Sequence, residues 1–311
     1  MFLTNKNSEI QEVFFSEIIN SGVSLFIKRE DKLHPEISGN KYRKLKYNLL
    51  EAFNQNKKTL VTFGGAFSNH IAAIAAAGIE FNFKTIGVIR GDEFKKDVEY
   101  YVNNNPTLKF ASGKNMQFLF VSRSDYRNKN DVTFIEDLKN RFGDFYLVPE
   151  GGTNTLAVKG CQEILMDAEK EFDVVCTSVG TGGTISGIIN AAHKHQKIMG
   201  FPALKGDFLK HEIKKYVLSN TNWSLNTNYH FGGYAKVSVE LINFINKFKS
   251  ETNIPLDPIY TGKMLFGLND LIKKGTFKSA TKILAIHTGG LQGIDGMNLL
   301  LKKKGMPLLD K

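Results

Sequence analysis

Lys41 and Lys44 stand in the segment Ile37-Ser-Gly-Asn-Lys-Tyr-Arg-Lys44, where a Gly-Asn pair leads into a helical pattern. A helix N-terminus offers free backbone N–H groups and a positive dipole end, and both favour an anion such as phosphate. The two lysines are one helical turn apart, so one amine can bond an aldehyde while the other faces a phosphate. Taken alone, the segment is more often a solvated basic helix start.

A second segment, Thr62-Phe-Gly-Gly-Ala-Phe-Ser-Asn-His70, leads from a strand through two glycines into an Ala-rich helix. Its first helical turn carries Ser68, Asn69 and His70. Such a junction exposes polar side chains at the carboxyl end of a strand, where ligands bind in open α/β sheets. Ser and Asn are also ordinary helix N-caps, and capping alone is the simpler explanation.

The third segment, Ser178-Val-Gly-Thr-Gly-Gly-Thr-Ile-Ser-Gly187, again joins a strand to a helix through glycines. Glycines let the backbone approach phosphate oxygens, and Thr181 and Thr184 supply hydroxyls. The spacing lacks the third glycine of the dinucleotide fingerprint and the Gly-Lys-Ser/Thr of the P-loop. The segment therefore predicts a phosphate cradle that holds neither a nicotinamide cofactor nor ATP.

Two further segments, Asp257-Pro-Ile-Tyr-Thr-Gly-Lys263 and Ala285-Ile-His-Thr-Gly-Gly290, end an extended stretch with a hydroxyl residue followed by glycine. This arrangement is typical of a site loop, and it is equally typical of a turn or a helix cap.

The elements that must position these segments alternate between apolar runs and helical periods, which predicts an α/β fold with mostly parallel twisted sheets flanked by helices. The expected strands cover residues 59–63, 85–89, 117–121, 145–148, 174–178, 197–201 and 283–287. The expected helices include residues 155–171, 184–195, 208–218, 237–249 and 263–273. The crowding of short units predicts a smaller α/β domain over residues 51–150. Residues 1–50 and 151–311 then form a larger one.

Composition excludes several classes of function. Of the 311 residues, 42% are hydrophobic and 23% charged, as in folded globular proteins. The formal net charge of +10 comes from scattered lysines without interleaved aromatic residues, so we expect no nucleic-acid partner. The N-terminus lacks a signal-peptide pattern and no stretch reaches about 18 apolar residues, so we expect no membrane association and a cytoplasmic protein.

Metal binding is not expected either. Cys161 and Cys176 have no CxxC partner and no ligand-spaced histidine, and we expect them to be buried free thiols. His193 and His195 fall on different helix faces and are expected at the surface.

Together, and in this order, these segments resemble the family of 1-aminocyclopropane-1-carboxylate deaminase and D-cysteine desulfhydrase. These are pyridoxal-phosphate enzymes of the tryptophan-synthase-β fold type, fold type II. The matching motifs are Lys28-Arg-Glu-Asp31, Gly39-Asn-Lys-Tyr-Arg-Lys44, Gly64-Gly-x-x-Ser-Asn-His70, Pro149-x-Gly-Gly152, the 180–187 loop, Tyr260-Thr-Gly-Lys263 and His287-Thr-Gly-Gly290.

The resemblance implies that Lys41 forms a Schiff base with pyridoxal 5'-phosphate, and that Lys44 helps to hold the phosphate. The resemblance further implies that the cofactor lies in the cleft between the two domains and that the protein is a homodimer. The implied phosphate cup consists of Thr181, Gly182, Gly183 and Thr184. Lysine suits this role because burial and nearby positive charge lower its pKa enough to supply a free amine.

The resemblance also assigns the substrate side. Asn69 bonds the ring hydroxyl of the cofactor, and Ser68 contacts the substrate carboxylate or takes part in proton transfer, with His70 beside them. Tyr260 matches one active-site tyrosine of the family, and Tyr234, in Phe-Gly-Gly-Tyr, matches a second.

Two positions depart from the deaminases of the family, which carry an acidic residue after the active-site tyrosine and an apolar residue in the final loop. Thr261 and Thr288 stand there, as in the desulfhydrase branch, and one of them faces the pyridine nitrogen. We therefore expect a lyase that eliminates sulfide from a small amino acid such as D-cysteine. The alternatives are ring-opening deamination of 1-aminocyclopropane-1-carboxylate and a cofactor-binding protein with little catalysis.

Overall fold

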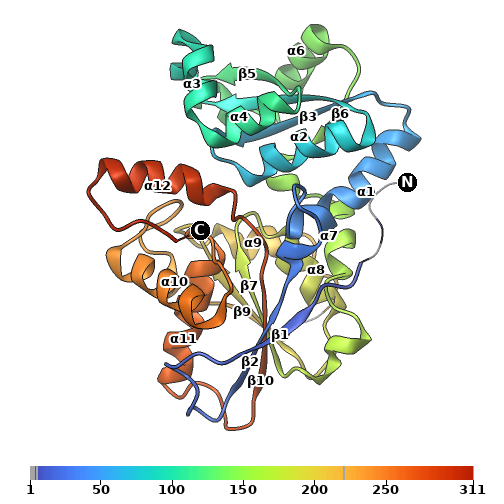
Figure 1. The fold of residues 1–311 in the computed structure, drawn as a ribbon. Coiled ribbons are helices and arrows are strands. Elements are labelled where there is room, and N and C mark those ends of the chain that lie inside the picture. Colours follow the sequence, from blue (N-terminus) through green and yellow to red (C-terminus); the bar gives the residue numbers. More distant parts are fainter. Residues whose placement is uncertain (1–3, 5, 220, 311) are drawn as a thin grey trace.

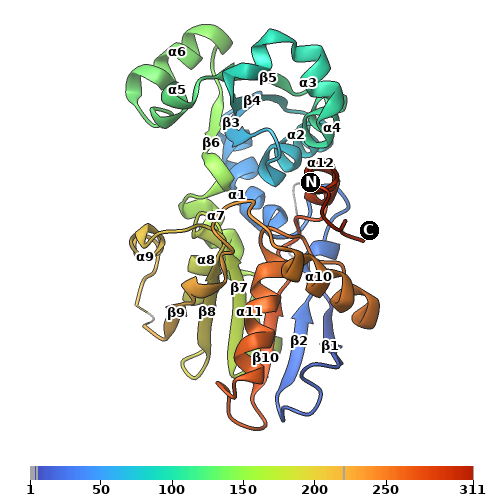
Figure 2. The same cartoon turned by 90° about the vertical axis from the view of Figure 1, so that its left-hand side faces the viewer.

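The computed structural model describes residues 4, 6–219 and 221–310, and contains two sheets flanked by helices (Figures 1 and 2). The larger sheet has six strands in the order β1-β2-β10-β7-β8-β9, and the smaller has four in the order β5-β4-β3-β6. All neighbouring strands run parallel except β1 and β2. The predicted α/β class is confirmed.

The strand bounds are β1 Ile10–Val13, β2 Ser24–Lys28, β3 Thr59–Gly65, β4 Lys84–Arg90, β5 Gln117–Val121, β6 Tyr146–Val148, β7 Val174–Val179, β8 Lys197–Pro202, β9 Trp223–Leu225 and β10 Lys282–Ile286. The α-helices are α1 Asn40–Asn54, α2 Asn69–Phe81, α3 Val98–Asn104, α4 Pro106–Gly113, α5 Arg123–Arg127, α6 Val132–Phe142, α7 Thr155–Gln162, α8 Gly183–Ala191, α9 Phe208–Lys214, α10 Val239–Thr252, α11 Thr261–Lys273 and α12 Gly293–Lys303.

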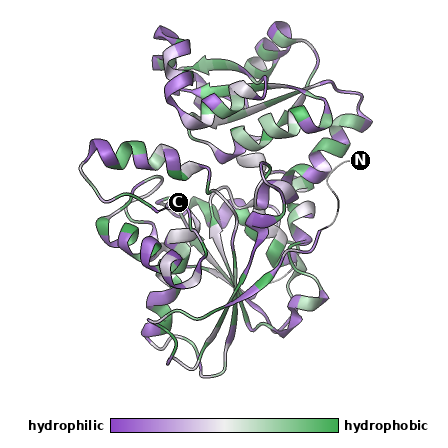
Figure 3. Cartoon of the chain, viewed as in Figure 1, coloured by the Kyte–Doolittle hydropathy of each residue, from purple (hydrophilic) through white to green (hydrophobic). Residues whose placement is uncertain are grey.

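Both sheets are covered on both faces, which explains the continuous apolar runs of their central strands. In β7, Val174 and Cys176 point into one core, while Val175 and Val179 point into the core on the opposite face. The same alternation in β3 sends Leu60 to one side and Val61 and Phe63 to the other. In Figure 3, hydrophilic and hydrophobic residues alternate around the outer helices, as expected where one face packs on a sheet.

The seven predicted strands are present with ends shifted by at most two residues, whereas β1, β2 and β9 were not predicted. The prediction of a single helix over residues 155–171 is wrong. Helix α7 ends at Gln162, Met166 is extended, and a 3-10 turn follows over Asp167–Glu171. The Glu169 carboxylate accepts the Met166 N–H at the start of this turn and also pairs with buried Lys28, which lies far away in the sequence.

The four-stranded sheet and helices α2 to α6 fall within residues 51–150, while α1 runs without a break across residue 50. The domain boundaries themselves stay a prediction. No helix within the described part of the chain is long and apolar enough to cross a membrane. Cys161 and Cys176 are buried free thiols, as expected.

Candidate active site

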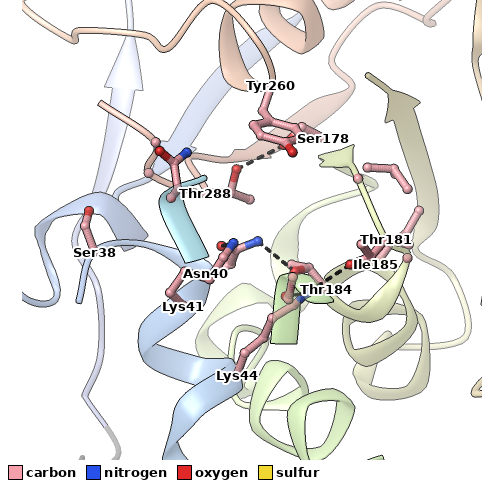
Figure 4. A pocket seen from close by; sticks show the side chains of 17 residues that line it. Ser38, Asn40, Lys41, Lys44, Ser178, Thr181, Thr184, Ile185, Tyr260 and Thr288 are labelled. Carbon is pink, nitrogen blue, oxygen red and sulfur yellow. Dashed lines mark hydrogen bonds between the residues drawn. The ribbon is translucent and has the colours of Figure 1, made fainter. Parts of the chain in front are cut away.

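A cavity lies where the carboxyl ends of β7 and β10 meet the N-terminal turns of α1, α2 and α8 (Figure 4). Its lining residues come from nearly all the segments singled out in the sequence. They are Ser38, Asn40, Lys41, Lys44, Asn69, Gly151, Ser178, Val179, Gly180, Thr181, Gly182, Thr184, Ile185, Tyr260, Thr288, Gly289 and Gly290.

Close helix packing brings the lysines to the phosphate loop. Helix α1 packs on α7, and α7 packs on α8. A Cβ atom at Gly160 of α7 would lie 2.0 Å from the Arg43 carbonyl oxygen of α1. A Cβ atom at Gly187 of α8 would lie 2.5 Å from the Cβ of Cys161. Glycine at both positions therefore permits a helix stack that places Lys41 opposite Thr184.

Lys41 belongs to a short hydrogen-bond chain across the cavity. Its Nζ donates to Asn40 Oδ1 at 2.9 Å, and Asn40 Nδ2 donates to Thr184 Oγ1 at 2.9 Å. Burial, and next the positive charge of Lys44, lower the pKa of Lys41 to about 7. A large share of the amine is thus uncharged near neutral pH, which is the state that attacks an aldehyde.

Lys44 points across the cavity toward the phosphate loop (Figure 4). Its Nζ donates to the Gly151 carbonyl and to Thr153 Oγ1, both at 2.9 Å, and to Thr181 Oγ1 at 3.4 Å. Burial lowers its pKa to about 8, so it stays largely charged at neutral pH.

The N-terminal turn of α8 forms the opposite wall. Gly182 precedes the helix with a φ of +87°, and no side chain caps the first turn. The first N–H groups of a helix lack partners within the helix, so an uncapped turn beside a lysine fits a phosphate group. Thr184 and Thr181 add hydroxyls on either side. The residues present therefore fit the predicted phosphate cup.

Of the three consecutive residues Ser68, Asn69 and His70, which were predicted to contact the cofactor or the substrate, only Asn69 lines the cavity. Ser68 caps α2, where its Oγ accepts the His70 N–H at 3.2 Å. The His70 imidazole faces β3, because its Nε2 contacts Thr62 Oγ1 at 2.8 Å. The Thr62 hydroxyl donates to the Val148 carbonyl, so His70 Nε2 is the donor in that contact. Its side chain is not among those that line the cavity, and the substrate contact of His70 stays a prediction.

Tyr260 lies in the cavity and Tyr234 lies beside it. Their ring centroids are 6.4 Å apart, and Tyr234 is 42% exposed. Burial, followed by the nearby Tyr234 and Asp257, raises the pKa of Tyr260 well above its usual value. Lys263 holds the loop that carries Tyr234 in place, because its Nζ donates hydrogen bonds to the His230 and Gly233 carbonyls.

The two threonines that distinguish this chain lie in different places. The Thr261 hydroxyl donates to Asp257 Oδ1 at 2.7 Å and is fully buried outside the cavity lining. Thr288 lines the cavity, and its Oγ1 lies 3.0 Å from Ser178 Oγ. Thr288 is therefore the one placed to meet a ligand, whereas Thr261 stabilises the turn that starts α11.

Several polar residues near the site were not predicted as site residues, including Asn40, Thr153, Ser178 and Gln292. Asn40 and Ser178 lie within the segments singled out, and Thr153 directly follows the Pro149-x-Gly-Gly152 motif, which is a signal that could have found all three. Gln292 offers no such pattern, because only the fold brings it to Asn69.

The fold and this site define a class of cofactor-dependent enzyme. The profile of the family described as "Pyridoxal-phosphate dependent enzyme" matches residues 13–289, and the chain belongs to that family. Its cofactor is pyridoxal phosphate.

Within the class, the chain is similar to the 1-aminocyclopropane-1-carboxylate deaminases and D-cysteine desulfhydrases. It is 30% identical to the bifunctional, mitochondrial D-cysteine desulfhydrase/1-aminocyclopropane-1-carboxylate deaminase of Arabidopsis thaliana, over 88% of this chain and 74% of that protein. The 1-aminocyclopropane-1-carboxylate deaminase of Rhizobium rhizogenes is 28% identical to this chain, over 90% of this chain and 91% of the deaminase. A crystal structure of an ACC deaminase homologue superposes with a TM-score of 0.81 at 27% identity, covering 97% of this chain and 95% of that one.

Proposed function

We propose that this protein is a lyase that releases sulfide from D-cysteine or a similar small amino acid by α,β-elimination, giving pyruvate and ammonia. The observation that carries the proposal is the chemistry of the cavity wall. None of the described residues that line the cavity is Asp or Glu. Thr288, whose Oγ1 lies 3.0 Å from Ser178 Oγ, stands where the deaminases that this chain resembles carry an apolar residue.

Pyridoxal phosphate, when bound, withdraws electrons from the Cα of an attached amino acid and so eases removal of its proton. The cost of that removal depends on the group that faces the pyridine nitrogen. A carboxylate would keep the nitrogen protonated and strengthen the electron withdrawal, whereas a threonine hydroxyl cannot hold that proton. A cavity wall that carries the Thr288 and Ser178 hydroxyls and no carboxylate therefore favours elimination of a thiol over ring opening.

β-Elimination of a thiol is less demanding than ring opening. The Cα proton leaves, the Cβ–S bond breaks with its electron pair on sulfur, and the resulting enamine hydrolyses to pyruvate and ammonia. Opening a cyclopropane ring offers no such leaving group.

The residues of this chain have the properties that the elimination needs. Lys41 has a pKa of about 7 and can accept a proton near neutral pH. Tyr260 stays protonated because its pKa is raised, so its hydroxyl is available as a hydrogen-bond donor to the substrate or to the departing sulfur. We propose that Asn69 orients the ring of the cofactor and that Ser68 and Tyr234 act from the mouth of the cavity.

Ring-opening deamination is the alternative, because one relative is a deaminase and another is bifunctional by name. A competition between substrates tests the choice. The holoenzyme is assayed for pyruvate from D-cysteine, L-cysteine and β-chloro-D-alanine, and for 2-oxobutanoate from 1-aminocyclopropane-1-carboxylate, with Lys41→Ala as the background control. We expect a higher kcat/KM for D-cysteine than for the cyclopropane substrate. An equal or higher value for the cyclopropane substrate contradicts the proposal.

A further inference from the structure

The side chain of Asn69 is held between two residues of the loop that follows β10, Gln292 and Gly290. Gln292 Nε2 donates to Asn69 Oδ1 at 2.6 Å. On the other side, a Cβ atom at Gly290 would lie 3.0 Å from Asn69 Nδ2. Gly290 has a φ of +96°, so the backbone reaches a conformation there that other residues rarely adopt.

This hydrogen bond links a helix that packs on the four-stranded sheet to the segment that follows β10 of the six-stranded sheet. Asn69 begins α2, which packs on the four-stranded sheet, whereas Gln292 precedes α12 at the end of the chain. Helix α12 lies against α4 (Figures 1 and 2). Helix α12 also lies close to the segment before α2. A Cβ atom at Gly296 of α12 would lie 2.6 Å from the ring of Phe67, so glycine is needed there. The helix therefore sets where Gln292 meets Asn69.

A carboxamide has one acceptor end and one donor end, and a partner at one end fixes which way the other faces. The bond from Gln292 is the only hydrogen bond to the Asn69 side chain among the described residues. By occupying Oδ1 it leaves the Nδ2 donor turned toward Gly290 and the cavity.

We propose that Gln292 is a positioning residue that fixes the Asn69 amide with its N–H donors toward the cavity, and that it thereby favours the ionised form of the cofactor's ring oxygen. The proposal rests on the proposed role of Asn69 toward the cofactor. An ionised oxygen accepts a hydrogen bond from an N–H group and is disfavoured beside a carbonyl oxygen, so the orientation of this amide decides which form is stabilised.

The test is a pH titration of the visible absorbance of the holoenzyme without substrate. Gln292→Met removes the donor without adding charge, and Gln292→Glu replaces the donor with a carboxylate that repels Asn69 Oδ1. We expect the midpoint of the absorbance change to rise in both variants, by about one pH unit in Gln292→Glu, the scale of one lost hydrogen bond to a charged group. Gln117→Glu is the matched control, since Gln117 is exposed on β5 and should leave the midpoint unchanged.

A double-mutant cycle separates positioning from a general structural effect. With Asn69→Ala already in place, Gln292→Met should cause no further shift. The proposal is overturned if Gln292→Met titrates like the parent, or if its shift persists unchanged without the Asn69 amide. Because no substrate is present, neither outcome depends on whether D-cysteine is the substrate.

Discussion

Replacing Asn40 by Asp tests the electrostatics of Lys41 without changing the shape of the site. In the parent, Lys41 Nζ lies 2.9 Å from Asn40 Oδ1, and burial followed by the charge of Lys44 holds the pKa of Lys41 near 7. A carboxylate at that distance favours the ammonium form over the free amine. The pKa of Lys41 must therefore rise in Asn40→Asp.

The size of the shift follows from the distance. Two unit charges about 4 Å apart interact with about 4 kcal/mol at an effective dielectric constant of about 20. Carboxylates at such distances shift neighbouring pKa values by roughly one to three units. The pKa of Lys41 is thus expected to move from about 7 into the range of about 8 to 10.

The assay is the rate at which the apoprotein gains visible absorbance after mixing with pyridoxal phosphate, measured across pH. Only the free amine reacts, so the rate rises with pH through the pKa of Lys41. The rising limb should move to higher pH in Asn40→Asp, and Asn40→Ala, which adds no charge, should not move it upward. An Asn40→Asp limb that coincides with the parent's would refute the reasoning.

Four further expectations concern the residues around the cavity. Thr261→Val should lower the free energy of unfolding by about 1–3 kcal/mol, because the buried Asp257 carboxylate loses one of its hydrogen-bond donors and keeps only backbone N–H groups. It should leave the cofactor spectrum unchanged, as chemical denaturation and absorbance spectra will report. Thr288→Val should instead alter the cofactor spectrum with little loss of stability, and the reverse pattern would reassign the two threonines. Lys263→Met frees the loop of Tyr234, so kcat/KM should fall while cofactor affinity holds; equal loss of both would mean that the loop serves the fold. Tyr260→Phe should lower kcat/KM by roughly 10²-fold, the scale of a positioned acid–base group, and parent-like turnover would remove Tyr260 from the reaction.

Local patterns in the sequence predicted the buried strands well. Strands such as β7 and β3 lie between two cores, so their apolar runs are continuous and bounded by glycine. The short edge strands β1 and β9 carry no such run, and their pairing depends on neighbours far along the chain. The break after α7 depends on a buried partner of Glu169 that no local pattern reveals.

The phosphate loop and the lysines could be predicted because each stands at a strand-to-helix junction that the sequence itself displays. The direction in which individual side chains point could not be predicted from the sequence. His70 follows Asn69 directly, yet its ring faces Thr62 rather than the cavity. Thr261 follows Tyr260, yet its hydroxyl donates a hydrogen bond to Asp257 and does not face the cavity. The contact between Gln292 and Asn69 joins residues 223 positions apart and is set by the packing of α12.

The most direct test of the assignment of this site is to find which lysine carries the cofactor. The purified holoenzyme is reduced with borohydride, which makes the bond to lysine permanent, and its peptides are mapped by mass spectrometry. The buried amine of Lys41, with its lowered pKa and its place opposite Thr184, predicts that the peptide containing Lys41 carries the label and that Lys41→Ala abolishes it. A label on Lys44 or on any other lysine would contradict the assignment.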